Sequence, residues 1–341
     1  MKRLILMMVV GLMLAMVLAV PAANYYYTAS WGEGCARCHE IRPNYESWQH
    51  ASHRDVNCTA CHESSLQTNL RRVQTHWSGD VPDRIRLATD DVLAMTEKCR
   101  ACHQQEYAQW NAGPHRSGYA RIFTDATHNR QRELMDDCFR CHGMHFEGAI
   151  GEIVKPLDTA GPWRLVDAKY ADQPTMPCLT CHAIHREGEP MMKKAERVGA
   201  QQETVRPSLA FFDRRSREHM PAEILPIPAM REGERPVKMS PDLRQGLCYQ
   251  CHAPLASAQV KSGDDRTPIG VHEGLSCLAC HQKHGQWTKP SCATCHPRLS
   301  NCNRDVEKMD TSFANPQSRH NVHWVKCSDC HEGKTPRHAK Q

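Results

Sequence analysis

The sequence of 341 residues is poor in the side chains that build a hydrophobic core. It has few aromatic residues, with Trp 7, Tyr 8 and Phe 6, and its mean hydropathy is −0.63. The N-terminal segment carries much of the apolar content, so residues 24–341 are too polar to bury the surface that such a chain normally buries. This scarcity argues against an ordinary core. It predicts that disulfides, or a bound metal or cofactor, fill the interior.

Cysteine and histidine are abundant instead, with 19 Cys and 22 His. Eighteen of the Cys fall into nine CxxCH motifs, where chance predicts only about 0.06 such motifs. Zinc sites give no reason for a His directly after every second Cys. Covalent haem c does, because the two thiols form thioether bonds and the adjacent His ligates the iron. The sequence therefore predicts nine haem c groups with iron.

The predicted thioether residues are Cys35, Cys38, Cys58, Cys61, Cys99, Cys102, Cys138, Cys141, Cys178, Cys181, Cys248, Cys251, Cys277, Cys280, Cys292, Cys295, Cys327 and Cys330. The predicted proximal ligands are His39, His62, His103, His142, His182, His252, His281, His296 and His331. Cys302 stands outside the motifs, and we expect a buried thiol or an intermolecular partner there. The sequence identifies no catalytic residue.

Thirteen other His compete for nine distal positions on the irons. The candidates are His53, His115, His145, His185, His272, His284 and His323, with His76 and His128 as two further choices. Three of them follow a proximal His by three residues, where a ring cannot reach the far face of its own haem. We therefore expect those three to ligate an adjacent haem. His50, His219 and His338 are expected to be non-ligands, and His320 competes with His323.

The N-terminus fits an export or anchor segment. Lys2 and Arg3 precede an uncharged apolar run over 4–20. The segment Val20-Pro21-Ala22 fits a cleavage site, whereas three Tyr at 25–27 fit an interfacial aromatic belt. We favour a retained anchor in the bacterial cytoplasmic membrane. The haem domains are then expected in the periplasm, because haem attachment to CxxCH takes place outside that membrane.

One haem per about 38 residues leaves no room for a conventional domain. We expect a multihaem cytochrome c of mainly short α-helices and loops packed around nine haems, with very little β and one transmembrane helix. The expected segments are an anchor over 1–23, a tetrahaem domain over 24–150, a one-haem segment with a Pro-rich linker over 151–247 and a second tetrahaem domain over 248–341. The long interval before Cys248 includes Phe211 and Phe212, which we expect to cover a haem.

The motifs Cys35-Ala-Arg-Cys38-His39-Glu-Ile-Arg-Pro43-Asn-Tyr45-Glu-Ser-Trp48-Gln-His50-Ala-Ser52-His53-Arg54 and Cys58-Thr-Ala-Cys61-His62 closely resemble the NapC/NirT family, nearest its small tetrahaem members. The resemblance covers about residues 1–150, and a five-haem extension follows. It implies menaquinol oxidation near the first haem, with electrons passed to a periplasmic partner. Ile41 stands where members of the nitrite reductase kind carry a Met ligand.

The leading hypothesis is therefore a membrane-anchored electron-transfer relay of anaerobic respiration, from menaquinol in the membrane quinol pool to a periplasmic redox protein or reductase. The alternatives are a soluble periplasmic multihaem carrier, and a multihaem reductase of a nitrogen or sulfur oxyanion. The formal charge of +5 does not indicate a nucleic-acid partner. Haem propionates and ferric iron bring the oxidised holoprotein to a net charge of about −4.

Overall fold

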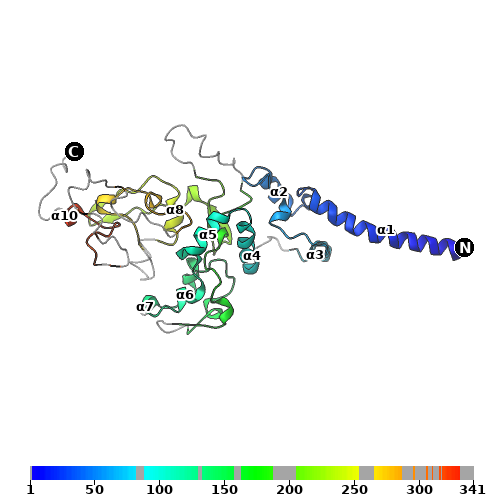
Figure 1. Ribbon diagram of the computed structural model, residues 1–341, viewed down its shortest axis with the longest axis horizontal. Helices are drawn as coiled ribbons and strands as arrows, with labels where there is room; N and C mark the ends of the chain where they lie inside the picture. The colour runs from blue at the N-terminus through cyan, green and yellow to red at the C-terminus, as the bar shows by residue number, and fades with distance from the viewer. Residues whose placement is uncertain are drawn as a thin grey trace. The chain divides into compact units, whose positions relative to one another are not determined.

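The structure is a computed structural model that describes residues 2–81, 88–129, 133–156, 163–186, 205–252, 265–285, 295, 305, 309, 315 and 317–330 (Figure 1). The chain divides into two compact units. Unit 1 comprises Met1–Cys102 and His182–Ser208, and unit 2 comprises His103–Cys181 and Leu209–Gln341. The four segments expected from the sequence stay a prediction. The described chain is mostly helical with little sheet, which confirms the expected fold class.

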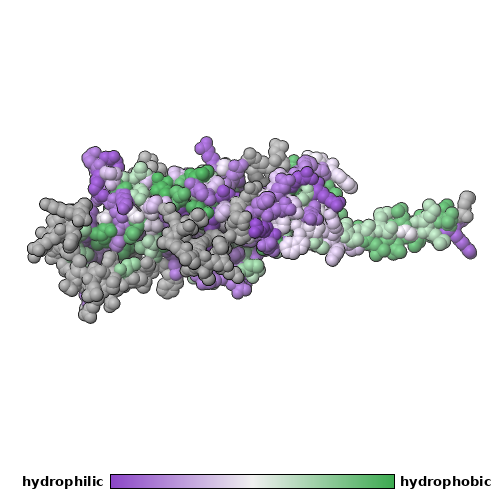
Figure 2. Space-filling view, turned by 90° about the horizontal axis from the view of Figure 1, so that it is seen from above, coloured by the Kyte–Doolittle hydropathy of each residue, from purple (hydrophilic) through white to green (hydrophobic). Residues whose placement is uncertain are grey.

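Unit 1 begins with the long helix α1 (Lys2–Ala29), whose apolar side chains are exposed along its length (Figures 1 and 2). At 1.5 Å per residue its 28 residues extend for about 42 Å, longer than the bilayer hydrocarbon core of about 30 Å. By length and composition, α1 is able to cross a membrane. The predicted N-terminal apolar helix is confirmed, and its helical backbone continues past residue 23.

Short elements follow α1 in unit 1. They are η1 (Cys35–Arg37), α2 (Arg42–Gln49), η2 (Cys58–Ala60), α3 (Leu66–Ser78) and α4 (Thr89–Arg100). The ends of α3 are defined by its sequence. The Ser65 hydroxyl accepts a hydrogen bond from the Thr68 N–H, and Gly79 adopts a left-handed φ of 76° at the C-terminus. These caps satisfy backbone groups that a 13-residue helix leaves without intrahelical partners.

Unit 2 consists of short helices and three small hairpins. Its helices are α5 (Gln104–Ala112), η3 (Pro114–Arg116), α6 (Tyr119–Phe123), α7 (Ala126–Asn129), η4 (Asp136–Arg140), η5 (Ile150–Glu152), η6 (Ala168–Tyr170), η7 (Cys178–Thr180), η9 (Ala222–Ile224), α8 (Gln245–Tyr249), η10 (Gly270–His272), η11 (Cys277–Ala279) and α10 (Cys327–Cys330). Its strands pair antiparallel as β1 (Val154–Lys155) with β2 (Arg164–Leu165), β3 (Ala210–Asp213) with β4 (Glu218–Pro221), and β5 (Arg231–Glu232) with β6 (Arg235–Pro236).

The β3–β4 hairpin lies in the long interval without a haem motif. Phe212 of β3 pairs with His219 of β4, and both Phe211 and Phe212 are buried. The described part of the interval thus contains this packed hairpin, the short turn η9 and the β5–β6 hairpin. Residues 225–230, which lie between η9 and β5, form neither helix nor strand.

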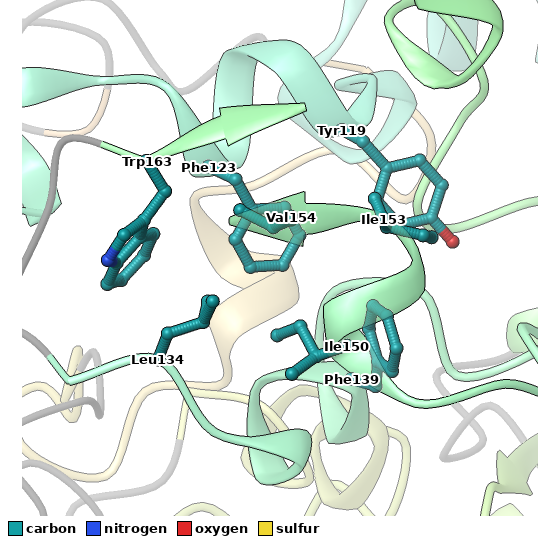
Figure 3. Close-up of a cluster of buried hydrophobic side chains, with 8 residues drawn as sticks. All are labelled: Tyr119, Phe123, Leu134, Phe139, Ile150, Ile153, Val154 and Trp163. Atoms are coloured by element: carbon teal, nitrogen blue, oxygen red, sulfur yellow. The ribbon is translucent and has the colours of Figure 1, made fainter. Parts of the chain in front are cut away.

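One apolar cluster departs from the scarcity seen in the composition. It lies in unit 2 and gathers eight buried side chains (Figure 3). The members are Tyr119, Phe123, Leu134, Phe139, Ile150, Ile153, Val154 and Trp163. The rings of Phe123 and Phe139 meet edge to face with centroids 6.3 Å apart, a favourable aromatic geometry. The chain therefore forms a small apolar core here, although its composition argues against an ordinary one. Four of the 21 aromatic residues lie in this cluster, and the others lie elsewhere along the chain.

Candidate haem centres

The CxxCH segments share one backbone turn. In seven motifs the N–H of the second Cys donates to the carbonyl of the first, as in Cys61 to Cys58 at 3.2 Å. In four of these the following His N–H also donates to that carbonyl, as His62 does at 2.8 Å. A tight turn of this kind brings two thiols and one imidazole together from five consecutive residues. In these seven motifs the local sequence therefore brings the two thiols and the imidazole together by itself.

None of the 17 cysteines that the structure describes is in a disulfide. Cys292, His296, Cys302, His331 and His338 lie outside the described residues. The predicted Cys295, Cys327 and Cys330 are described, but the proximal His of their two motifs are not.

Four proximal His rings each face a second His ring across a similar gap. The pairs and their centroid distances are His39–His76 at 5.8 Å, His62–His185 at 5.8 Å, His115–His252 at 6.5 Å and His281–His323 at 6.0 Å. A metal–imidazole bond of about 2 Å, plus about 1.2 Å from nitrogen to ring centroid, places two rings about 6.4 Å apart across one metal. The observed separations are close to this value. The imidazoles of three pairs would therefore fit one haem iron each, whereas between His39 and His76 lies the Glu40 carboxylate.

Burial keeps several of these imidazoles in the neutral form that binds metal. Desolvation lowers the pKa of His115 to about 4 and that of His185 to about 4. It also lowers the pKa values of His62 and His281. At neutral pH these side chains present a lone pair.

Two distal candidates in unit 2 have one ring nitrogen next to a fixed acceptor. His272 Nδ1 lies 2.8 Å from the Val322 carbonyl oxygen, and His323 Nδ1 lies 3.3 Å from Oδ1 of the buried Asn321. Histidine ligands commonly hold their second nitrogen in this way, which fixes the tautomer and the ring orientation. Asn321 was not predicted from the sequence. Its position two residues before His323 was the available signal.

The first motif has an additional acidic side chain. Oε1 of Glu40 lies 3.1 Å from Nε2 of His39 and 3.1 Å from Nδ1 of His76. A backbone hydrogen bond lowers the pKa of Glu40, and the charges of His39 and His76 lower it further. His76 lies on α3, so this helix contributes a side chain to the site of the first motif. The sequence did not predict a role for Glu40, although it directly follows the motif.

His145 has a different neighbourhood. Its ring stacks on Phe212 with centroids 4.1 Å apart and an interplanar angle of 21°. Burial lowers its pKa to about 3. Phe212 also meets His219, whose Nε2 lies 2.7 Å from the Leu179 carbonyl oxygen within the fifth motif. The β3–β4 hairpin thus packs against the distal candidate His145. Phe212, which we expected to cover a haem, covers the ring of His145.

The remaining distal candidates are His53, His128 and His284. His53 contributes to the electrostatic environment of His185, and His284 to that of His115. The side chain of His128 lies outside the described residues. All distal assignments stay predictions.

Cysteines of different motifs lie against one another in unit 2. The thiol of Cys251 donates a hydrogen bond to Cys141, which raises the pKa of Cys251 and lowers that of Cys141. Cys248 donates to Cys277 with the same effects. The charge of Cys181 also contributes to raising the pKa of Cys248 and of Cys251. The sixth motif therefore adjoins the fourth, fifth and seventh.

Unit 1 shows the same kind of proximity. The charge of Cys35 contributes to raising the pKa of Cys58, and that of Cys99 contributes to raising the pKa of Cys61, in both cases after desolvation as the larger cause. The Lys98 ammonium donates to the Cys61 carbonyl at 2.6 Å, which ties α4 to the second motif. The second motif therefore lies between the first and the cysteines of the third.

Two family models match separate parts of the chain. Residues 98–157 match the model of cytochrome c554 and c-prime, and residues 236–297 match that of cytochrome c7 and related cytochrome c. The chain is also similar to the cytochrome c-type protein NrfH of Wolinella succinogenes, with 27% identity over 104 residues. This match covers 27% of the present chain and 58% of that relative. No solved structure matches the chain.

The comparisons and the geometry lead to the same class of protein. Both matched models describe c-type cytochromes, and the matched ranges contain CxxCH motifs in which the structure shows the common turn. The similarity to NrfH agrees with the resemblance of the first two motifs to the NapC/NirT family. The chain is a multihaem c-type cytochrome with an N-terminal apolar helix that fits a membrane anchor.

Proposed function

We propose that this cytochrome takes electrons from menaquinol at the membrane surface and passes them through nine haem c groups to a periplasmic redox protein or reductase. The observation that carries the proposal is the short separation in sequence between the anchor helix and the first motif. Helix α1 ends at Ala29, and the first thioether residue is Cys35. The first centre is therefore held a few residues from the end of a helix that fits a membrane span.

The facing His pairs support electron transfer over substrate reduction. Haem c, when bound, supplies one-electron chemistry at its iron. A chain that offers imidazoles on both sides of an iron leaves no open position for a substrate. The facing rings at the second, sixth and seventh motifs support such an arrangement.

The contacts between motifs support a route inside each unit. In unit 1 the order by proximity is first, second and third motif. In unit 2 the sixth motif adjoins the fourth, the fifth and the seventh, through Cys251, Cys181 and Cys248. Haems attached at adjoining motifs would lie close together. Electron transfer between them would be fast, because the tunnelling rate falls steeply with distance. The proposed route in unit 2 thus departs from sequence order at the sixth motif.

The charge at the N-terminus supports the proposed orientation. Lys2 and Arg3 are the only basic residues before the apolar run, and basic residues flanking a span remain on the cytoplasmic side. The haem motifs then lie in the periplasm, behind a retained single anchor. Mass spectrometry of the mature protein tests this point. An intact N-terminal segment is expected, and a mature start near Ala23 overturns the anchor.

Anaerobic reduction tests the quinol step. The full-length holoprotein, solubilised in detergent, is mixed with a menaquinol analogue and followed by its visible haem spectrum. We expect reduction of at least the haems near the membrane, with the oxidised quinone as control. Full reduction by dithionite but none by the quinol overturns the menaquinol step.

A further inference from the structure

We propose that α3 is a second membrane-contacting element. The helix lies in the lipid interface beside the end of α1, and its exposed apolar stripe faces the bilayer. We define the stripe as Leu66, Leu70, Val73 and Trp77. This proposal depends on retention of the anchor and does not depend on quinol oxidation.

The stripe is continuous and exposed. Its members stand at positions i, i+4, i+7 and i+11, which at 100° per residue fall within an arc of about 60°. Their exposed fractions are 41%, 56%, 44% and 84% in chain order. Four large apolar side chains on one exposed helix face are unusual on a soluble surface and mark an interaction site.

The rest of α3 is polar and contains no acidic residue. Arg71 and Arg72 lie outside the stripe, and the Arg72 guanidinium donates to Asn69 Oδ1 and to the Glu63 carbonyl, both at 3.2 Å. An apolar face with Trp and Leu, opposed by a face with Arg, is typical of helices that lie in a membrane interface.

A hydrogen bond places α3 at the level of the interface. The Asn69 amide donates to Asn24 Oδ1 at 3.1 Å, and Asn24 is the first strongly polar residue after the apolar run of α1. Since α1 is about 12 Å longer than the hydrocarbon core, its C-terminal turns extend into the headgroup region. Tyr25, next in the chain, is 73% exposed, as expected for an aromatic belt.

These relationships identify the bilayer as the occupant. The surface of α1 is apolar along its length, as a helix that spans the bilayer hydrocarbon requires (Figure 2). The Asn24–Asn69 hydrogen bond makes the stripe an extension of that lipid-covered surface. Since His76 of α3 faces His39, lipid contact would also hold the first motif at the membrane surface.

Photo-crosslinking tests the proposal in the full-length holoprotein reconstituted into phosphatidylcholine–phosphatidylglycerol nanodiscs. The photoreactive residue p-benzoylphenylalanine replaces Leu70, Val73 or Trp77 in separate variants. The matched control replaces Arg71, which is exposed on another face of the same helix. The visible haem spectrum and the haem content of each variant establish that it is folded.

We expect lipid adducts, detected by mass spectrometry, at the stripe positions at about fivefold or more above the Arg71 position. Equal yields on both faces overturn the proposal, as does an absence of lipid adducts from folded variants. Adducts that join two copies of the chain, in place of lipid, also overturn it. Because the readout is independent of menaquinol, it separates failure of this proposal from failure of the proposed function.

Discussion

The imidazole rings of His62 and His185 face each other with centroids 5.8 Å apart and an interplanar angle of 37°. His62 belongs to the second motif, whereas His185 follows the proximal His of the fifth motif by three residues. The two side chains are therefore brought together by the fold and not by local sequence. A metal between them would join two distant segments, as a disulfide does in other small domains.

Replacement of His185 by Met tests that pairing. We expect haem 2 to remain six-coordinate and its reduction potential to rise, because Met in place of His raises the potential of a c-type haem. Potentiometric titration followed by visible spectra measures the change. The control is His50→Ala, at a position expected to be a non-ligand. Identical titrations for the His185 variant and the parent would exclude His185 as an axial ligand.

The His76→Ala variant tests the first centre. Without the second imidazole facing His39, we expect one haem of the predicted nine to become high-spin in the ferric state. Electron paramagnetic resonance measures this directly, with Gln74→Ala on the same helix as control. A wholly low-spin spectrum from the His76 variant would assign another distal ligand to haem 1.

Asp242 provides a prediction of pH dependence. Hydrogen bonds from Arg244 and Ser276 lower its pKa from 3.8 to about 2, and Ser276 immediately precedes the seventh motif. Because the folded-state pKa is depressed, this stabilisation is present above about pH 4 and is lost as the pH falls toward about 2. We expect Asp242→Asn to cost about 1 kcal/mol at pH 6 and progressively less below pH 4.

Thermal unfolding of the holoprotein, followed by circular dichroism at several pH values, measures that difference. The control is Glu234→Gln, since the Glu234 side chain is fully exposed. A stability loss in the Asp242 variant that is constant from pH 6 to pH 2 would contradict the linkage.

Phe139 tests the contribution of the apolar cluster. It is fully buried, and the Arg214 guanidinium carbon lies 4.8 Å from its ring centroid. We expect Phe139→Ala to cost about 3–5 kcal/mol, because it removes a large buried side chain and leaves a cavity. Chemical denaturation measures this, with the exposed Leu243→Ala expected to change stability by less than about 0.5 kcal/mol. Similar denaturation midpoints for the two variants would show that the cluster contributes little to the free energy of unfolding.

Removal of the cofactor tests how the whole chain is stabilised. Outside the cluster, 11 of the 25 buried side chains that the structure describes are polar. We therefore expect chain produced without haem attachment to unfold without a cooperative transition, because polar segments bury too little apolar area to offset conformational entropy. Circular dichroism against temperature checks this. A sharp transition in the apo-protein would mean that side-chain packing suffices.

Part of the fold was predictable because it is local. The CxxCH spacing places two thiols and a His within five residues, and seven motifs share one backbone turn. The apolar run predicted α1, since its composition alone favours a helix that crosses a membrane. The composition argued against an ordinary core but did not predict the small cluster around Phe139, because averages over a chain do not report how side chains gather.

By itself, then, the sequence determined the kind of cofactor and predicted the number of candidate sites and a proximal ligand for each, since these depend on residues within one turn of chain. Only the tertiary structure decided that His76 faces His39 with Glu40 between them, and that Cys251 meets Cys141. Such partners are separated by segments whose path depends on packing and hydrogen bonding. Spacing along the chain limits which residues are able to meet, and the fold selects among them.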